Sequence, residues 1–287
     1  MKILITGATG FIGNHLINTL LKIPNVEIIA SSRSQIKAQR FDWYEKVTFI
    51  QYDFTKEIKQ DLYSYFDKPN ILIHLAWSDL NNYKSLTHIE VTLSQHIAFI
   101  NNIITNGLQK IIVTGTCFEY GDINGCISED TPTNPTLPYS IAKDTLRRYI
   151  EQLNKSFSFE YIWLRLFYMY GPNQPERSLF PSLDRAIANN EKSFNLSGGE
   201  QIRDYLHITK MAETITSIAL LPNYTNEVIN CCSGDSISLR NLIEEYLNDI
   251  DTNIKLNFGY YPYPDYEPMA FWGDTSKLKK ILGITNK

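Results

Sequence analysis

The stretch that decides the fold is Thr6-Gly7-Ala8-Thr9-Gly10-Phe11-Ile12-Gly13, close to the start of the chain. The preceding run Lys2–Thr6 is apolar and β-branched, which predicts a strand, and the residues that follow have the pattern of a helix. Gly7 permits a tight turn, Gly10 lets the backbone approach a pyrophosphate, and Gly13 lets the helix pack close to the strand. Because a helix N-terminus offers free N–H groups to phosphates, the stretch predicts a dinucleotide-binding turn.

Beyond this turn, short β-branched runs alternate with helical stretches. Nearly continuous apolar runs such as Ile71-Leu72-Ile73 are typical of parallel strands buried on both faces. Strands that alternate with crossover helices predict an α/β fold of Rossmann type, a doubly wound parallel sheet. The expected strands are Lys2–Thr6, Val26–Ala30, Val47–Gln51, Ile71–Leu75, Ile111–Thr114 and Glu160–Leu166, and the expected helices are Phe11–Lys22, Ser85–Asn106 and Ser140–Lys155.

The pattern changes after about residue 167. Turn-rich pieces and the aromatic, proline-rich run Tyr260–Pro268 interrupt shorter elements there. We therefore expect an NAD(P)-binding Rossmann domain over residues 1–166. A smaller substrate-binding lobe over residues 167–287 would be partly interleaved with it.

Composition excludes several classes of protein. The 287 residues include 27 Lys and Arg against 31 Asp and Glu, a formal net charge of −4, and 43% of them are apolar. This composition is typical of a globular protein and gives no electrostatic footprint for nucleic acid or acidic membranes. No apolar run approaches the ~20 residues of a membrane helix, and the first residues do not resemble a signal peptide. We expect a cytoplasmic protein that binds neither nucleic acid nor membrane.

The four cysteines are Cys117, Cys126, Cys231 and Cys232. They lack C-x-x-C spacing and have no nearby histidine that would complete a zinc site. We expect reduced thiols and no metal centre.

A second motif, Tyr139-Ser140-Ile141-Ala142-Lys143, places a phenol and an ammonium group four residues apart, on one face of a helix. A nearby cation favours the phenolate, so Lys143 is expected to lower the pKa of Tyr139 and make it a usable proton donor. Thr116 ends a predicted buried strand, at the edge of the sheet where ligands bind in such folds. The three side chains predict a catalytic group.

These motifs resemble those of the extended short-chain dehydrogenases/reductases, the NAD(P)-dependent epimerase/dehydratase family acting on nucleotide sugars. The resemblance runs over nearly the whole chain. Further stretches that carry it are Asp53-Phe54, His74-Leu75-Ala76, Arg165–Pro172 and Gly199–Ile208. Residues 259–283 are similar to the tail of reductases and synthases for nucleotide-linked 4-keto-6-deoxy sugars.

The resemblance implies a role for each motif. Tyr139 is the general acid/base, Lys143 positions the nicotinamide ribose, and Thr116 hydrogen-bonds the reacting sugar oxygen. Asp53 contacts the adenine and Arg203 binds the substrate diphosphate. The implied cofactor-binding residues are Gly7, Thr9, Gly10, Phe11, Ile12, Gly13, Ser32, Arg33, Asp53, Phe54, Leu75, Ala76, Tyr139 and Lys143, and the implied substrate-binding residues are Thr116, Cys117, Phe118, Tyr139, Tyr168 and Arg203.

Departures from the family pattern reduce the number of family reactions that this chain is expected to catalyse. Family dehydratases carry an acidic pair after the catalytic threonine, whereas Cys117 and Phe118 stand here, which disfavours a 4,6-dehydratase. Glu119 follows one position later and is expected to be a structural carboxylate. A family epimerase base does not transfer to Cys117, because neighbouring residues of an extended chain point to opposite sides. Tyr168 stands where many relatives have an asparagine that touches the substrate.

The end of the second strand bears on the cofactor. NAD-preferring relatives end this strand with an acid that bonds the ribose 2′-OH. Ser31 and Ser32 stand here instead, followed by Arg33 and, farther on, Lys37. This arrangement predicts a preference for NADP(H), with NAD(H) possible.

The sequence therefore favours an NADPH-dependent reductase of the C4 keto group of a nucleotide-linked 4-keto-6-deoxy sugar, in deoxysugar biosynthesis for a surface polysaccharide such as lipopolysaccharide O-antigen. One alternative is a nucleotide-sugar 4-epimerase with bound NAD. Another is a non-enzymatic NADP-binding regulatory protein, although cofactor binding alone does not require Thr116, Tyr139 and Lys143 together. The resemblance also implies a homodimer formed through Ser85–Asn106 and Ser140–Lys155.

Overall fold

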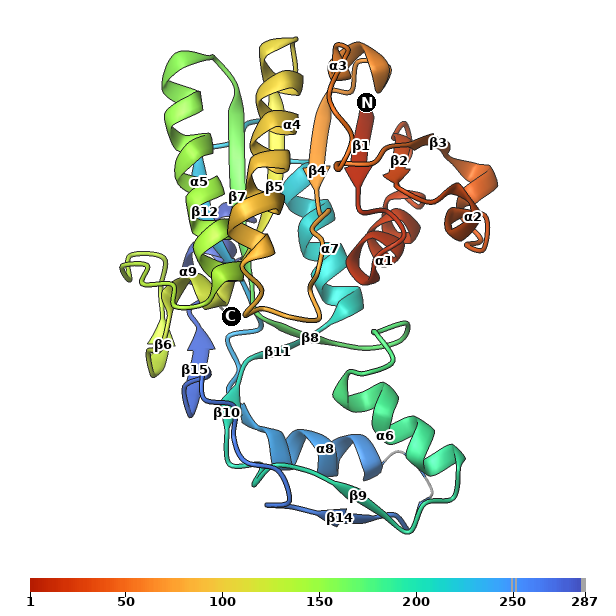
Figure 1. Cartoon of the computed structure of the whole chain (residues 1–287), viewed down its shortest axis with the longest axis vertical. Helices are drawn as coiled ribbons and strands as arrows, with labels where there is room; N and C mark the ends of the chain where they lie inside the picture. The colour runs from red at the N-terminus through yellow and green to blue at the C-terminus, as the bar shows by residue number, and fades with distance from the viewer. Residues whose placement is uncertain (249, 251, 285–287) are drawn as a thin grey trace.

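The computed structural model in Figure 1 describes residues 1–248, 250 and 252–284, and a seven-stranded parallel sheet forms its upper part. The strand order is β12-β7-β5-β4-β1-β2-β3, so the chain starts in the middle and winds outward in both directions. This order confirms the predicted α/β, doubly wound fold. The strands are β1 (Lys2–Thr6), β2 (Glu27–Ser32), β3 (Thr48–Gln51), β4 (Ile71–His74), β5 (Lys110–Thr116), β7 (Glu160–Leu166) and β12 (Glu227–Cys231).

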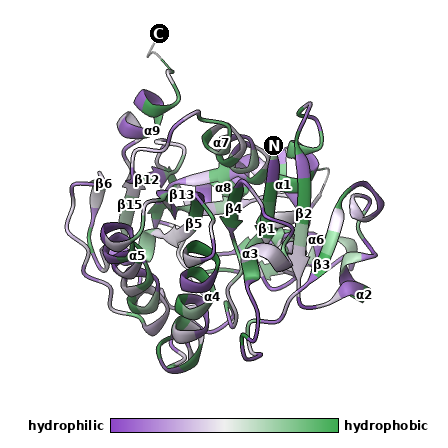
Figure 2. Cartoon of the chain, turned by 90° about the horizontal axis from the view of Figure 1, so that it is seen from above, coloured by the Kyte–Doolittle hydropathy of each residue, from purple (hydrophilic) through white to green (hydrophobic). Residues whose placement is uncertain are grey.

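Helices cover both faces of this sheet. Successive side chains of a strand point to opposite faces, so Ile3 and Ile5 pack with α1 and α7 while Leu4 packs with α3, α4 and α5. The strands in the middle of the sheet are mostly hydrophobic in Figure 2, as burial on both faces requires. The helices are α1 (Phe11–Leu20), α2 (Gln35–Ala38), α3 (Leu62–Tyr65), α4 (Leu93–Thr105), α5 (Pro138–Ser156) and α7 (Ile208–Ala219), with 3₁₀ turns η1 (Tyr44–Lys46) and η3 (Cys117–Tyr120).

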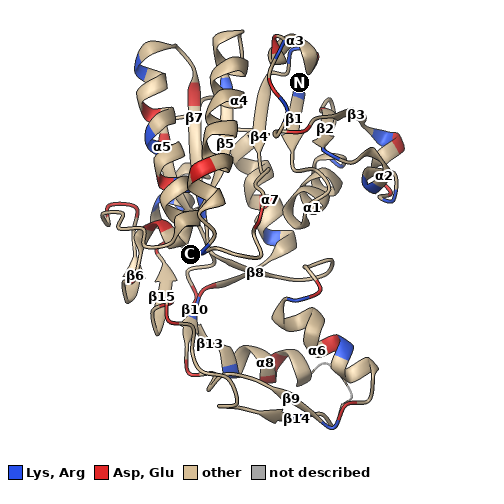
Figure 3. Ribbon diagram, viewed as in Figure 1, with Lys and Arg blue, Asp and Glu red and all other residues tan. Residues whose placement is uncertain are grey.

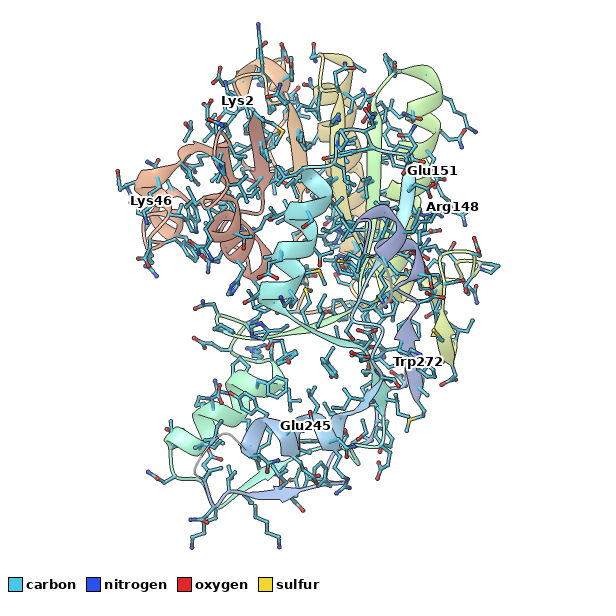
Figure 4. All side chains as sticks on the ribbon, turned by 180° about the vertical axis from the view of Figure 1, so that it is seen from behind. Lys2, Lys46, Arg148, Glu151, Glu245 and Trp272 are labelled. Carbon is cyan, nitrogen blue, oxygen red and sulfur yellow. The ribbon has the colours of Figure 1, made fainter. Side chains whose placement is uncertain are left out.

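Helix α5 positions two of the predicted catalytic residues. Pro138 occupies its first turn, where a missing N–H costs nothing. Its inward face buries Leu146, Ile150 and Leu153 together with Tyr139 and Lys143. The outward face carries charged side chains, among them Arg148 and Glu151, which are labelled in Figure 4.

The predicted helix Ser85–Asn106 is not continuous. A π-helical turn, η2 (His88–Thr92), precedes α4. His88 is fully buried, and its ring accepts a hydrogen bond from Trp77 Nε1 at 3.1 Å and donates one to Asn82 O at 3.0 Å. These contacts join the π-helical turn to the preceding loop. Turns of this kind occur frequently at functional sites.

The smaller lobe forms the lower part of Figure 1 and has its own core around Leu183, Leu196 and Ile243. After residue 167 the chain also returns to the large sheet, because α7 packs on that sheet and β12 is its edge strand. The division at residue 167 therefore remains a proposal. The remaining strands are β6 (Gly125–Ile127), β8 (Tyr168–Tyr170), β9 (Ser193–Asn195), β10 (Ile202–Arg203), β11 (Tyr205–His207), β13 (Ile237–Ser238), β14 (Lys255–Asn257) and β15 (Ala270–Gly273), with helices α6 (Leu179–Ala188), α8 (Leu239–Asn248) and α9 (Ser276–Ile281).

Positive and negative residues are interspersed along the ribbon (Figure 3). Within the described ranges, no helix is long and apolar enough to cross a membrane. In the same part of the chain, no group of three or more His, Cys, Asp or Glu could hold a metal ion.

Candidate active site

A cleft of about 750 Å³ opens at the carboxyl ends of β1, β2, β4 and β5. Its lining runs from the glycine turn to the loop between β8 and α6. All the predicted cofactor-binding residues line it, as do the predicted substrate-binding residues with the exception of Arg203. The residues expected from separate motifs therefore meet in one place.

The glycine turn is shaped to take a dinucleotide. Gly7 has φ +71°, and a Cβ on it would lie 2.9 Å from the backbone nitrogen of Ala76. A Cβ on Gly13 would lie 2.4 Å from Gly7 O, so this glycine allows α1 to approach β1. A Cβ on Gly10 would meet only Gly7 O, at 3.1 Å, and would otherwise fill the open cradle at the start of α1. These residues fit the pyrophosphate of a bound NAD(P).

The adenosine end of the cleft carries positive charge. Ser32, Arg33 and Lys37 line it, and Arg33 is exposed. Asp53 also lines it and accepts hydrogen bonds from the backbone and side chain of Thr55, which lower the pKa of its carboxyl group. The structure thus places Arg33 and Lys37 beside Ser32, with no acid at the end of β2.

The three predicted catalytic side chains meet at the opposite end. Thr116 is the last residue of β5, and Tyr139 and Lys143 lie one turn apart on α5. All three are at least nine-tenths buried. Lys143 Nζ donates to Thr114 O at 2.8 Å, and the Thr116 side chain lies near the Tyr139 hydroxyl.

The electrostatics of this group differ from the sequence expectation. Burial raises the pKa of Tyr139 well above its ordinary value, with Tyr83 as the next cause, and the nearby Thr116 side chain opposes this only in part. Burial also lowers the pKa of Lys143 to about 7, while Glu119 opposes this effect. The predicted lowering of the tyrosine pKa by Lys143 is therefore not seen, because desolvation dominates both groups.

Two aromatic residues that the sequence analysis missed complete this end of the cleft. Trp77 lies under the Lys143 ammonium, which is 4.1 Å from the ring centroid, and it stacks on His96. Tyr83 stacks on Tyr139 with ring centroids 5.1 Å apart, and its carbonyl accepts the Tyr139 backbone N–H. The position of Trp77 directly after Leu75-Ala76 was a usable signal, whereas nothing in the local pattern around Tyr83 pointed to the site.

The residues after Thr116 have distinct environments. Cys117 is buried, which raises the pKa of its thiol, so it is unsuited to act as a base. Phe118 lines the cleft. Glu119 is fully buried and pairs with Arg165 at 2.8 Å, which agrees with a structural carboxylate.

The predicted diphosphate anchor, Arg203, lies outside the lining of the cleft. Its side chain is 2% exposed, and its guanidinium pairs with Glu267 at 2.9 Å. Arg177, in the loop before α6, is exposed and lines the cleft. Tyr168 also lines it, and its buried hydroxyl has no hydrogen-bond partner among the described residues.

The fold and this site define an NAD(P)-dependent oxidoreductase of the short-chain dehydrogenase/reductase class. The chain belongs to the NAD dependent epimerase/dehydratase family, whose model matches residues 3–232. It is an enzyme that acts on a nucleotide sugar.

Individual relatives give a finer comparison. The chain is 29% identical to dTDP-6-deoxy-L-talose 4-dehydrogenase (NAD(+)) of Aggregatibacter actinomycetemcomitans, over 95% of this chain and 99% of the relative. It is 27% identical to dTDP-4-dehydro-6-deoxyglucose reductase of Escherichia coli, over 84% of this chain and 79% of the relative. Among solved structures, UDP-glucuronic acid 4-epimerase from Bacillus cereus, in complex with UDP-glucuronic acid and NAD, matches with a TM-score of 0.85 and 25% identity, over 100% of this chain and 94% of that one.

Proposed function

We propose that this enzyme uses NADPH to reduce the C4 keto group of a nucleotide-linked 4-keto-6-deoxy sugar. The observation that carries the proposal is that Thr116, Tyr139 and Lys143 meet in one cleft. Thr116 is followed in the sequence by Cys117 and Phe118, at the positions where a dehydratase would need an acidic pair. Two relatives support the substrate class, because their names place their reactions at C4 of dTDP-linked 6-deoxy sugars.

Each side chain has a defined task in this reaction. NADPH, when bound, would supply a hydride for C4 of the sugar. Tyr139 retains its proton in the buried site and donates it to the C4 oxygen as negative charge develops there. The Thr116 hydroxyl hydrogen-bonds the same oxygen and stabilises that charge. Lys143, which lines the cleft, would hold the nicotinamide ribose.

The wall beside Tyr139 favours a methyl group at C6 of the sugar. Tyr83, Cys117, Phe118 and Tyr168 line the cleft and make up this wall. Among the cations that line the cleft, Lys143 lies on the same helix as Tyr139 and donates to Thr114 O, whereas Arg33, Lys37 and Arg177 belong to other segments. An unpaired carboxylate against such a wall would be costly. The Tyr168 hydroxyl has no partner among the described residues, and we expect it to donate a hydrogen bond to a sugar oxygen.

The preference for NADPH rests on the positive charge at the end of β2. Arg33 and Lys37 line the cleft there, and a 2′-phosphate would neutralise that charge. One relative carries NAD(+) in its name and the Bacillus cereus epimerase was solved with NAD, so NAD(H) is the competing choice.

The function is tested by incubating the purified enzyme with NADPH and TDP-, CDP-, GDP- and UDP-linked 4-keto-6-deoxy sugars. We expect loss of absorbance at the reduced-nicotinamide band and a product with a new stereocentre at C4, which nuclear magnetic resonance can assign. The proposal would be contradicted if the enzyme oxidised no NADPH with any of these substrates.

The likeness to the Bacillus cereus epimerase favours a nucleotide-sugar 4-epimerase as the second candidate. An epimerase returns the hydride to the same sugar, so it would be isolated with NAD bound and would show no net NADPH oxidation. Release of NAD on denaturing the freshly purified protein, together with interconversion of 4-epimers, would identify this activity.

We also propose that the enzyme is cytoplasmic and forms a homodimer through the outward faces of α4 and α5. Light scattering coupled to gel filtration would give the mass in solution. A mass of one chain at micromolar concentration would contradict the dimer.

A further inference from the structure

We propose that Glu119 is a positioning residue, whose buried carboxylate fixes the backbone of Thr116 and so directs the Thr116 hydroxyl at the reacting oxygen. The inference rests on the proposed function only in that Thr116 must touch the substrate. It gives a specific task to a carboxylate that the reaction itself does not use.

The carboxylate of Glu119 is inaccessible to solvent and is surrounded by donors. Its Oε1 accepts the Thr116 backbone N–H at 2.9 Å and the Trp163 indole N–H at 3.0 Å. Its Oε2 accepts from Arg165 Nε at 2.8 Å. A Cβ on Gly115 would lie 2.3 Å from Glu119 Oε1, so the absent side chain there makes room for the carboxylate.

While Glu119 accepts the Thr116 backbone N–H, the Thr116 side chain in turn accepts a backbone N–H of the turn that contains Glu119. Thr116 Oγ1 accepts the backbone N–H of Phe118 at 3.3 Å, which together with the Glu119 contact forms a capping box at η3. A hydroxyl has one proton and two lone pairs. With one lone pair directed at Phe118, the proton and the second lone pair of the hydroxyl remain for the reacting oxygen and for Tyr139, which lies nearby.

The donors around Glu119 come from the sheet and not from a loop. Arg165 pairs with Gly115 in the β5–β7 register, and Trp163 lies two residues earlier on the same strand. The Arg165 guanidinium lies 4.4 Å from the centroid of the Tyr120 ring, whose hydroxyl donates to Asn230 at 2.7 Å. A site supported by strands in this way keeps its geometry more closely than one supported by loops.

Two double variants separate positioning from general stability. In Glu119→Gln/Arg165→Met and in Glu119→Leu/Arg165→Met, both charges are removed together, so neither variant leaves an unpaired buried charge. With Arg165 absent, the glutamine oxygen can still accept the Thr116 N–H, whereas leucine cannot. The two variants therefore differ in the Thr116 contact under test and in the bond from the Trp163 indole N–H, which leucine cannot accept either. The Thr116→Val background separates these two contacts, because only an effect that acts through the Thr116 hydroxyl disappears there.

We expect the leucine variant to have a kcat roughly 10–100-fold below that of the glutamine variant, because small misplacements of a catalytic group are costly. The KM for the sugar nucleotide and the Kd for NADPH should agree between the two within about threefold. In a Thr116→Val background the difference in kcat should disappear. Equal kcat values in the two double variants, or the same difference in the Thr116→Val background, would overturn the proposal.

Glu119→Gln alone provides a second test if a double variant does not fold. The charged Arg165 attracts the amide oxygen, so the amide NH₂ faces the Thr116 N–H and the contact is lost. The same fall in kcat at unchanged KM is expected, and a kcat within twofold of wild type would overturn the proposal. Glu129→Gln is the matched control, because Glu129 accepts the Asn230 backbone N–H at 2.7 Å and does not line the cleft.

The outcome can be separated from that of the proposed function. If the wild-type enzyme reduces no 4-keto sugar with NADPH, the proposed function fails. The Glu119 comparison is then made on hydride transfer between a nucleotide hexose and bound NAD, which uses the same threonine and tyrosine.

Discussion

The ring of Tyr139 is buried and stacked on Tyr83, and its hydroxyl lies near the Thr116 side chain. Burial raises its pKa, so the phenol remains protonated at neutral pH and is ready to act as an acid. This suits a reduction, in which the enzyme must supply a proton to the sugar oxygen.

Replacing Tyr139 with phenylalanine should lower kcat for reduction by about 10²–10⁴-fold, the usual contribution of a positioned acid. The Kd for NADPH should change little, because the ring and its stacking on Tyr83 remain. Stopped-flow reduction assays and a fluorescence titration measure the two quantities. Near-normal turnover would contradict the proposed mechanism.

Titration of Lys143 should make the activity of the enzyme fall at alkaline pH. Burial lowers its pKa to about 7, so the ammonium form is lost as the pH rises through that value. We expect kcat/KM for NADPH, which reports on the free enzyme, to fall above about pH 7. In Lys143→Arg the charge persists, so any remaining activity should be flat over the same range. An identical alkaline limb in both enzymes would show that another group titrates.

Arg33 should set the choice between cofactors. One charge-assisted contact to a 2′-phosphate contributes about 1.5–3 kcal/mol, or roughly a 10–150-fold preference for NADPH over NADH. Steady-state kcat/KM for the two cofactors should show this preference in the wild type and its loss in Arg33→Ala. A wild-type preference for NADH, or a ratio unaffected by the substitution, would favour the epimerase alternative.

At the scale of elements, the junction of β1 and α1 assigns different tasks to its glycines. The backbone around Gly13 leaves no room for a side chain, whereas Gly10 borders the open cradle. One glycine therefore serves packing and the other serves the ligand.

Gly10→Ala and Gly13→Ala should separate these tasks. A Cβ at position 10 would enter the cradle, so we expect weaker NADPH binding and a nearly unchanged midpoint of unfolding. A Cβ at position 13 would lie 2.4 Å from Gly7 O, and overpacking of this kind costs about 1–3 kcal/mol of stability. Urea denaturation and cofactor titration are carried out on both variants, so that each variant is the control for the other. Equal losses of stability would contradict the distinction.

At the scale of the whole molecule, segments distant in sequence meet beside the cleft. Lys84, in the loop before η2, pairs with Asp265 of the C-terminal segment at 2.8 Å. Two residues farther along, Glu267 pairs with the buried Arg203. A substrate diphosphate that binds Arg203 must therefore compete with Glu267.

Arg203→Ala should weaken binding of a nucleoside diphosphate by roughly 10–150-fold, the equivalent of about 1.5–3 kcal/mol for a charge-assisted contact. Glu267→Gln should strengthen binding, because a competing charge is removed. Calorimetry with the free nucleoside diphosphate measures both, and Arg177→Ala tests the cation that already lines the cleft. Unchanged affinity in Arg203→Ala would show that this residue is a structural partner of Glu267.

Much of the fold and of the catalytic group could be predicted because both depend on short-range patterns. Gly7, Gly10 and Gly13 meet the demands of one turn, and Tyr139 and Lys143 share a helix face by their spacing alone. The parallel sheet follows from the alternation of strands and helices along the chain. Each of these features is decided within a few residues or by the order of elements.

The tertiary structure alone decided the features that depend on residues distant in sequence. It stacked Tyr83 on Tyr139, placed Glu267 against Arg203 and returned β12 to the edge of the sheet. It also reversed the expected shift of the Tyr139 pKa. That shift depends on how completely the surrounding elements remove water from the phenol, and desolvation is a property of the packed molecule that residue spacing does not encode.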